Sequence, residues 1–128
     1  MKLLLDTCAF LWFQAGSPEL SDSALSAILD PSNEVYLSAV SVWEIARKYA
    51  RGWITLPEPP STLIPTVRDA SGIASLPLTE RDALEAERLP MWHKHPFDRM
   101  LIAQAMVREM ALVSADGIFE RYAVRLLW

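Results

Sequence analysis

The sequence is poor in cysteine and contains no long apolar run. Cys8 is the only cysteine among 128 residues, so no internal disulfide can form. We expect its thiol to be buried filler, as free cysteines usually are. No apolar stretch approaches the roughly 20 residues of a membrane span. Residues 1–5 lead directly into Asp6 without a signal-peptide core. These features predict a cytoplasmic protein with no membrane contact.

Positive charge is also scarce. The chain carries 12 Lys and Arg against 16 Asp and Glu, a formal net charge of −4. This is the wrong sign for a protein that holds nucleic acid by a general positive field. Any contact with nucleic acid must therefore be local or bridged by a metal ion.

What the chain does have is enough apolar residues for one core. With 52% hydrophobic and 22% charged residues, we expect a single globular domain over residues 1–128. Short apolar runs and helical periodicity alternate along it. The predicted strands are 2–5, 34–37, 73–76, 111–114 and 124–127, and the predicted helices are 7–14, 22–29, 42–50, 61–70, 80–89, 97–110 and 117–122.

The links between these strands are too long for hairpins. Alternating strands and helices with such links predict an α/β fold with a parallel sheet. We expect a three-layer α/β/α domain with a short central sheet of about five strands.

Four acidic residues fall at positions that such a fold brings together. Asp6 directly follows the first strand, and Asp116 lies just beyond the fourth. Glu44 and Asp98 lie in the first turns of the helices 42–50 and 97–110. Sites in parallel sheets form beyond the carboxyl ends of the strands. The four carboxylates are therefore predicted to face one pocket.

Four carboxylates in one cleft repel each other and call for a neutralising cation. Magnesium prefers oxygen ligands and is usually shared between protein carboxylates and substrate phosphates. It can activate a water molecule for in-line attack and stabilise charge on a phosphate, so the predicted chemistry is attack of water at a phosphate. The same aspartates could instead have a purely structural role, because Asp is common as a cap or first-turn residue at helix starts. Likewise, Ser41 and Glu44 resemble a capping box.

The same residues lie in motifs that resemble those of the PIN-domain ribonucleases, and within them the VapC-type toxins of toxin–antitoxin pairs. The similarity extends along nearly the whole chain. Its pieces are Leu-Leu-Leu-Asp-Thr at 3–7, Ser-Val-Trp-Glu-Ile-Ala at 41–46, Pro-Phe-Asp-Arg-Met-Leu-Ile-Ala-Gln-Ala at 96–105 and Leu-Val-Ser-Ala-Asp at 112–116.

The resemblance implies RNA cleavage that depends on Mg²⁺, with Mn²⁺ as a substitute. The acidic residues of the family fall on the four carboxylates already selected. Further residues would support them: Ser114 and Thr7 in the motifs, and Arg99 and Lys48 as neighbours that could touch phosphate or simply be solvated. The resemblance also implies a cognate antitoxin and a homodimer. Trp12, Trp53 and Trp92 are candidate anchors for the antitoxin, although core packing could explain each of them.

The sequence departs from its relatives at two positions. Cys8 stands where many have His, and His95 stands where many have Asp, so a fifth acidic group is missing. This favours one metal ion over two. His93 and His95 are read as ordinary loop residues rather than zinc ligands, because no Cys or acidic residue stands beside them.

Two other functions are compatible with an α/β fold that carries these acids. A receiver-like phosphoryl-transfer domain using Asp6 would need a second acid next to it and a lysine after a late strand, and the chain has neither. A degenerate PIN domain could bind RNA or act as a scaffold without catalysis. The presence of all four acids argues against that reading.

Overall fold

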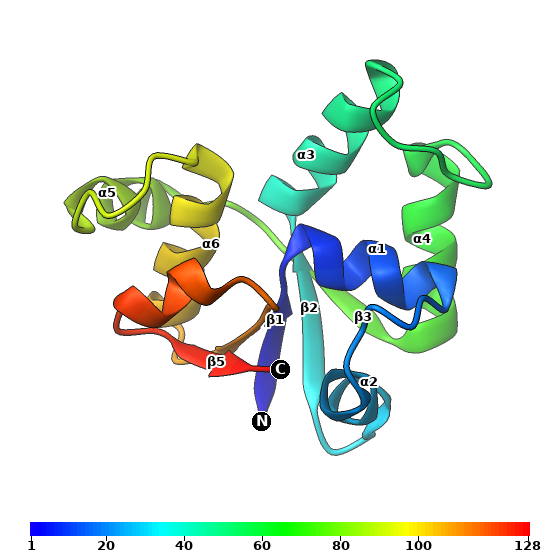
Figure 1. The fold of residues 1–128 in the computed structure, drawn as a ribbon, viewed down its shortest axis with the longest axis horizontal. Helices are drawn as coiled ribbons and strands as arrows, with labels where there is room; N and C mark the ends of the chain where they lie inside the picture. The colour runs from blue at the N-terminus through cyan, green and yellow to red at the C-terminus, as the bar shows by residue number, and fades with distance from the viewer.

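The computed structural model describes residues 1–128, which form one α/β domain (Figure 1). The strands are β1 (Lys2–Leu5), β2 (Glu34–Ser38), β3 (Ile73–Leu76), β4 (Ala111–Val113) and β5 (Arg125–Leu127). The helices are α1 (Thr7–Ala15), α2 (Asp22–Leu29), α3 (Ala39–Ala50), α4 (Pro60–Ser71), α5 (Glu80–Arg88) and α6 (Pro96–Val107), with a 3₁₀ helix η1 (Gly117–Arg121).

The five strands form one fully parallel sheet in the order β3-β2-β1-β4-β5. The central strand β1 pairs Leu3 with Val35 of β2 on one side and with Ala111 of β4 on the other. All five strands therefore end at the same edge. The predicted parallel sheet is confirmed.

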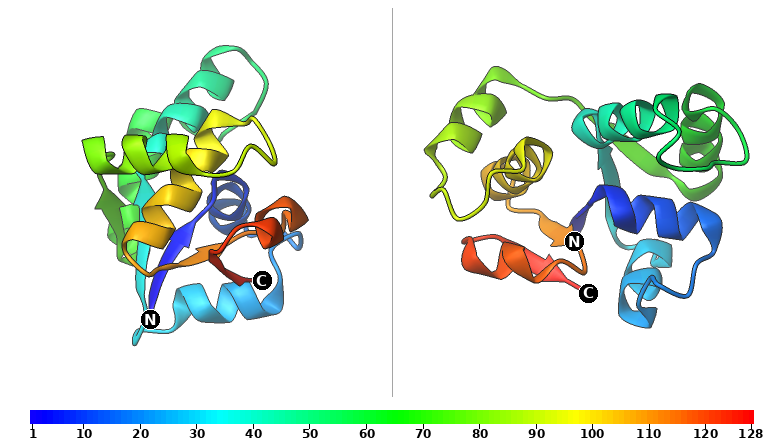
Figure 2. Two further views of the ribbon diagram at one scale, coloured as in Figure 1. Left: turned by 90° about the vertical axis from the view of Figure 1, so that its left-hand side faces the viewer. Right: turned by 45° about the horizontal axis from the view of Figure 1, so that its top comes forward.

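Helices cover both faces of the sheet (Figure 2). Successive side chains of a strand point to opposite faces. Leu3 and Leu5 pack with Phe10 of α1 in one core cluster, which also receives residues of α2, α3 and α4. Leu4 packs with Leu101 of α6 in a second cluster, beside η1. The three-layer α/β/α architecture is therefore confirmed.

Two predicted helix ends are wrong. The third helix begins at Ala39 rather than at residue 42, because Ser38 is its N-cap and accepts a hydrogen bond from the Val40 N–H at 3.0 Å. The predicted cap, Ser41, is buried within the helix and its hydroxyl has no partner. The sixth helix ends at Val107 rather than at residue 110, since Glu109 adopts a left-handed φ of 54°.

The remaining predicted bounds agree to within one or two residues. The seventh predicted helix is observed as 3₁₀. No helix in the structure is long and apolar enough to cross a bilayer.

A buried ion pair joins α5 to the end of α6. Asp82 has no exposed surface, and Arg108 donates to its two oxygens at 2.6 and 3.0 Å. Thr79 forms a reciprocal capping box with Asp82, and Gln104 donates to the same carboxylate at 3.2 Å. Burial alone would raise the pKa of Asp82, but these hydrogen bonds together hold it below its ordinary value. The network fixes the helical layer that carries Asp98.

Candidate active site

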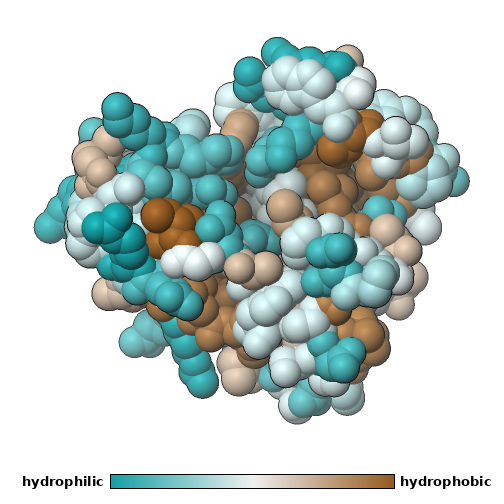
Figure 3. Space-filling model, viewed as in Figure 1, coloured by the Kyte–Doolittle hydropathy of each residue, from teal (hydrophilic) through white to brown (hydrophobic).

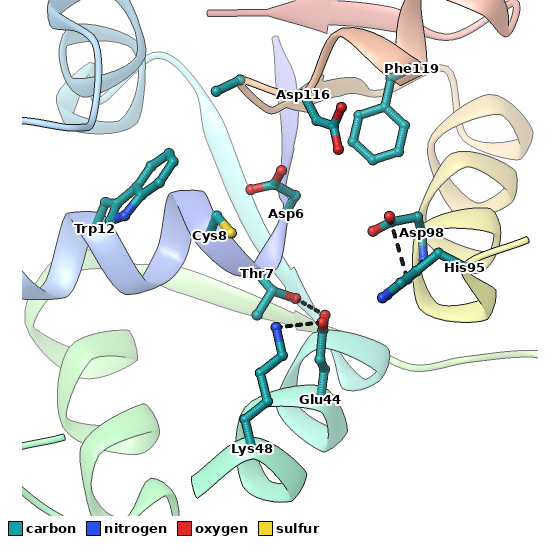
Figure 4. A pocket seen from close by; sticks show the side chains of 11 residues that line it. Asp6, Thr7, Cys8, Trp12, Glu44, Lys48, His95, Asp98, Asp116 and Phe119 are labelled. Atoms are coloured by element: carbon teal, nitrogen blue, oxygen red, sulfur yellow. Dashed lines mark hydrogen bonds and ion pairs between the residues drawn. The ribbon is translucent and has the colours of Figure 1, made fainter. Parts of the chain in front are cut away.

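The four predicted carboxylates line one cavity of about 430 Å³ at the carboxyl edge of the sheet (Figure 4). Asp6 follows β1, and Asp116 lies three residues beyond β4, the neighbouring strand. Glu44 reaches the cavity from α3 and Asp98 from the first turn of α6. Segments far apart in the sequence are thus brought together as the topology predicted.

Capping and site formation coexist in two of these residues. The Asp6 carboxylate accepts the Ala9 N–H at 2.7 Å and caps α1. The Asp116 carboxylate accepts the Ile118 N–H at 3.0 Å and caps η1. A carboxylate has several acceptor positions. The capping explanation is therefore correct for both residues, and it does not remove them from the pocket.

Glu44 is held by two neighbours. The Thr7 hydroxyl donates to its Oε1 at 2.6 Å, and the Lys48 ammonium lies 3.0 Å from its Oε2 (Figure 4). The carboxylate is buried, with 5% of the residue exposed. Because α3 begins at Ala39, Glu44 lies in the second turn, and the capping box predicted with Ser41 is absent. Thr7 and Lys48 lie at the site, as the resemblance implied.

Two histidines flank Asp98. His95 Nδ1 lies 3.4 Å and His93 Nε2 3.7 Å from Asp98 Oδ2. His95 is the N-cap of α6, and the Nδ1 of His93 is 2.7 Å from the Tyr122 hydroxyl. The statement that no acidic residue lies beside these histidines is wrong, because Asp98 contacts both of them. The signal was present in the spacing, since residue 95 is three positions before Asp98 at a helix start.

Arg99 does not face the pocket. Only 6% of the residue is exposed, and its guanidinium donates to the carbonyls of Ala86, Leu89 and Pro90 at 2.8–2.9 Å. Consecutive helix residues point about 100° apart, so Arg99 turns away from Asp98 toward α5. The predicted phosphate contact and the alternative of a solvated charge are both wrong. Arg99 instead fixes the loop that follows α5.

Ser114 holds the backbone next to the Asp116 carboxylate. It is the residue after β4 and is 3% exposed. Its hydroxyl accepts the Asp116 N–H at 3.1 Å.

The cavity also has an uncharged wall that the sequence did not predict. Besides the residues already described, Cys8, Trp12, Ala115 and Phe119 line it. Cys8 is exposed, so the prediction of a buried thiol is wrong. Its side chain lies on the face of α1 that turns to the pocket rather than to the core. Residues 8 and 12 share that face, since they are four apart in a helix.

The electrostatics of the pocket disfavour ionised acids. The pKa of Asp6 is raised to about 6, chiefly by burial; the hydrogen bonds of Ser114 and Ala9 oppose the rise, and the charges of Asp98 and Glu44 add to it. Burial likewise raises the pKa of Asp98, and Glu44 and Asp116 add to the rise while His95 and His93 oppose it. The acids therefore sense one another across the cavity. Lys48 is the only lysine or arginine that lines it.

The donor set fits magnesium in chemistry. As the side chains lie, no three His, Cys, Asp or Glu residues form a ready-made metal site. Magnesium does not require one, because it keeps several waters and usually takes only one or two protein carboxylates. The four carboxylates that line the cavity can supply those ligands.

Comparison with known proteins identifies the fold. Residues 3–125 match the PIN domain family. No curated protein matches the sequence. The fold is similar to that in the crystal structure of VapBC2 from Rickettsia felis bound to a promoter DNA fragment, at 15% identity and a TM-score of 0.73, covering 98% of this chain and 97% of that chain.

Two further structures are similar over nearly their whole length. DNA-bound VapBC from Salmonella typhimurium is 18% identical with a TM-score of 0.69, and VapBC-1 from nontypeable Haemophilus influenzae is 17% identical with a TM-score of 0.68. Each match covers 98% of this chain and 96% of the other. The family match spans almost the entire sequence and agrees with the parallel sheet and its acidic edge. The chain therefore belongs to the PIN domain family.

Proposed function

We propose that the protein is a magnesium-dependent ribonuclease and the toxin of a toxin–antitoxin pair. The observation that carries the proposal is the convergence of Asp6, Glu44, Asp98 and Asp116 on one cavity from four separate segments of a PIN domain. If these acids served only as helix caps, nothing would require the acids of α3 and α6 to lie in the same cavity as the acids that follow β1 and β4.

Asp6, Asp98, Asp116 and Glu44 are the residues that would hold the ion. When bound, magnesium supplies an activated water and charge stabilisation for hydrolysis of a phosphodiester bond. The protein's own groups position these acids. Thr7 and Lys48 hold the two oxygens of Glu44, and the cap of α1 fixes Asp6. Mn²⁺ has similar oxygen preferences and is expected to substitute for Mg²⁺.

Purified protein tests the activity. It should degrade RNA with magnesium and stop when a chelator is added. Asp6→Asn and Asp98→Asn should each abolish cleavage, whereas Glu87→Gln, which changes an exposed acid of α5, should leave it unchanged. Both Asn variants cutting as fast as the parent would show that these carboxylates are only caps. Bound RNA that is never cut would instead favour a non-catalytic PIN domain.

The toxin role is supported by similar structures that are described as toxin–antitoxin systems. A second observation supports a protein partner. An apolar groove of about 430 Å³ lies between α3 and α4, with Val42, Ile64 and Pro65 in its lining, within the brown surface of Figure 3. Amphipathic helices commonly dock in such grooves. Expression without a partner should arrest growth and degrade RNA, and Asp98→Asn should relieve both effects.

The homodimer is the remaining part of the proposal. Several large apolar side chains are exposed, and Trp43 and Trp53 expose 64 and 65% of their surface. Exposed aromatic residues of this size are typical of interfaces. Light scattering of the purified protein should give twice the 14.4 kDa of one chain. A monomer over the whole accessible concentration range would contradict it.

A further inference from the structure

One wall of the acidic cavity is built from α1 and is uncharged. Cys8 and Trp12 are four residues apart and line the cavity from the same face of that helix. Figure 4 shows the Cys8 thiol between the Asp6 carboxylate and the Trp12 indole. The indole therefore lies on the cavity wall beside the acidic side chains.

The indole is held in place by its neighbours. Trp12 packs against the Trp128 ring with centroids 5.8 Å apart and planes at 57°. It also packs on the core cluster beneath α1, while part of its surface remains open to the cavity. A ring fixed in this way loses little freedom when another ring stacks on it.

For an RNA strand with a phosphate among the carboxylates, the wall with Trp12 is the uncharged part of the cavity that a neighbouring base can reach. The acidic side would repel any further phosphate, whereas a base is neutral and offers a flat π face. A volume of 430 Å³ is the size of a small-ligand site and accommodates one nucleotide rather than a paired helix. The uncharged wall and the size of the cavity thus favour a single unstacked base.

We infer that Trp12 stacks on an unpaired base next to the scissile phosphate and thereby selects where the RNA is cut. The inference rests on the proposed ribonuclease function and adds a specificity-determining residue to it. Stacking of a base on an aromatic side chain contributes about 1–3 kcal/mol. Losing it should reduce kcat/KM about 5- to 150-fold.

The test pairs the indole with the base it contacts. Cleavage rates are measured for the parent, Trp12→Phe and Trp12→Leu on a short unpaired RNA, and on the same RNA with single abasic nucleotides placed around the cut. Leu keeps apolar packing without a π face, so it guards against a simple loss of folding, which thermal melting checks. Leu84→Ala, which truncates a 68% exposed apolar side chain of α5 outside the cavity, is the control.

Trp12→Leu should lose the stated factor, Trp12→Phe should retain most of the activity, and Leu84→Ala should match the parent. One abasic position should cost the parent the same factor and cost Trp12→Leu nothing more. Fully additive losses at every position would overturn the inference, as would equal cleavage of the same sequence in a duplex. A variant that cuts normally but binds a co-expressed protein partner more weakly would assign Trp12 to that partner instead.

A binding measurement separates this inference from the proposed function. Stacking on the indole should quench an RNA that carries 2-aminopurine beside the bound phosphate, and Trp12→Leu should abolish the quenching. If the parent cuts no RNA but quenches in this way, the nuclease proposal fails while the stacking stands. If it cuts RNA without Trp12-dependent quenching, the stacking fails alone.

Discussion

Replacing Asp6 with Asn should stabilise the protein while abolishing cleavage. Asp6 as a residue is 8% exposed, and the pKa of its carboxyl rises from 3.8 to about 6 on folding, chiefly because it is buried. The folded state therefore binds a proton more tightly than the unfolded chain. Stability from this group is fully present below pH 3.8 and is lost as the pH rises through about 6.

The magnitude follows from the shift. A rise of about 2 pKa units at 1.36 kcal/mol per unit corresponds to about 3 kcal/mol lost by neutral pH. Asn cannot ionise, and its side-chain oxygen can still accept the Ala9 N–H that Asp6 accepts. Asp6→Asn should thus be about 3 kcal/mol more stable than the parent at pH 7.5 and nearly equal to it at pH 4.

Urea unfolding at a series of pH values, in chelator, measures this difference directly. Other acids titrate in both proteins, so the difference between the two curves isolates Asp6. Adding magnesium should stabilise the parent, because a ligand of the folded state shifts the unfolding equilibrium, and should stabilise Asp6→Asn much less. A stability difference that does not change with pH, or a variant less stable at pH 7.5, would refute the assigned burial cost.

Three further variants probe neighbouring contacts. Asp82→Asn should lower the free energy of unfolding by about 3–5 kcal/mol, measured with urea, because it leaves the charge of Arg108 without its partner. Asp69→Asn, at an exposed acid of α4, is the control. A loss below about 1 kcal/mol for Asp82→Asn would contradict the network. Arg99→Met should destabilise the protein by several kcal/mol, because three backbone carbonyls lose their charged donor. Arg88→Met, at the exposed end of α5, should not destabilise it. Equal stabilities of the two variants would show that the buried contacts of Arg99 do not stabilise the fold. Thr7→Val should leave the fold intact and lower metal affinity or activity about 10- to 100-fold, because Glu44 loses its hydroxyl donor, and Thr7→Ser should restore the lost affinity or activity. Calorimetric titration with magnesium measures the affinity, and cleavage assays measure the activity. Unchanged affinity and activity in Thr7→Val would show that Glu44 does not need the Thr7 hydroxyl.

The sheet and its acidic edge could be predicted because each depends on simple patterns. Short apolar runs separated by helical periodicity define parallel strands, and the residues that follow such strands must share an edge. Asp6 and Asp116 could therefore be placed from their positions alone. Glu44 and Asp98 followed because the helices that carry them begin at that edge.

The contacts around these acids could not be predicted in the same way. Ser38 and Ser41 are equally good caps by residue type, and only the observed start of α3 chooses between them. Arg99 follows Asp98 in the sequence, yet one helical step turns it into the space between α5 and α6. The exposure of Cys8 likewise depends on which face of α1 meets the core. These outcomes are set by packing between elements, which a sequence pattern does not contain.

The acidic site also explains how a chain with a net charge of −4 could handle RNA. Without a cation, the carboxylates around the cavity repel a phosphate, and Lys48 is already paired with Glu44. A bound divalent ion would offset most of the local negative charge and relieve the cost of keeping Asp6 ionised. RNA affinity and protein stability should consequently rise over the same range of magnesium concentration. Tight RNA binding in chelator, with stability still responding to magnesium, would show that the strand is held somewhere other than the acidic cavity.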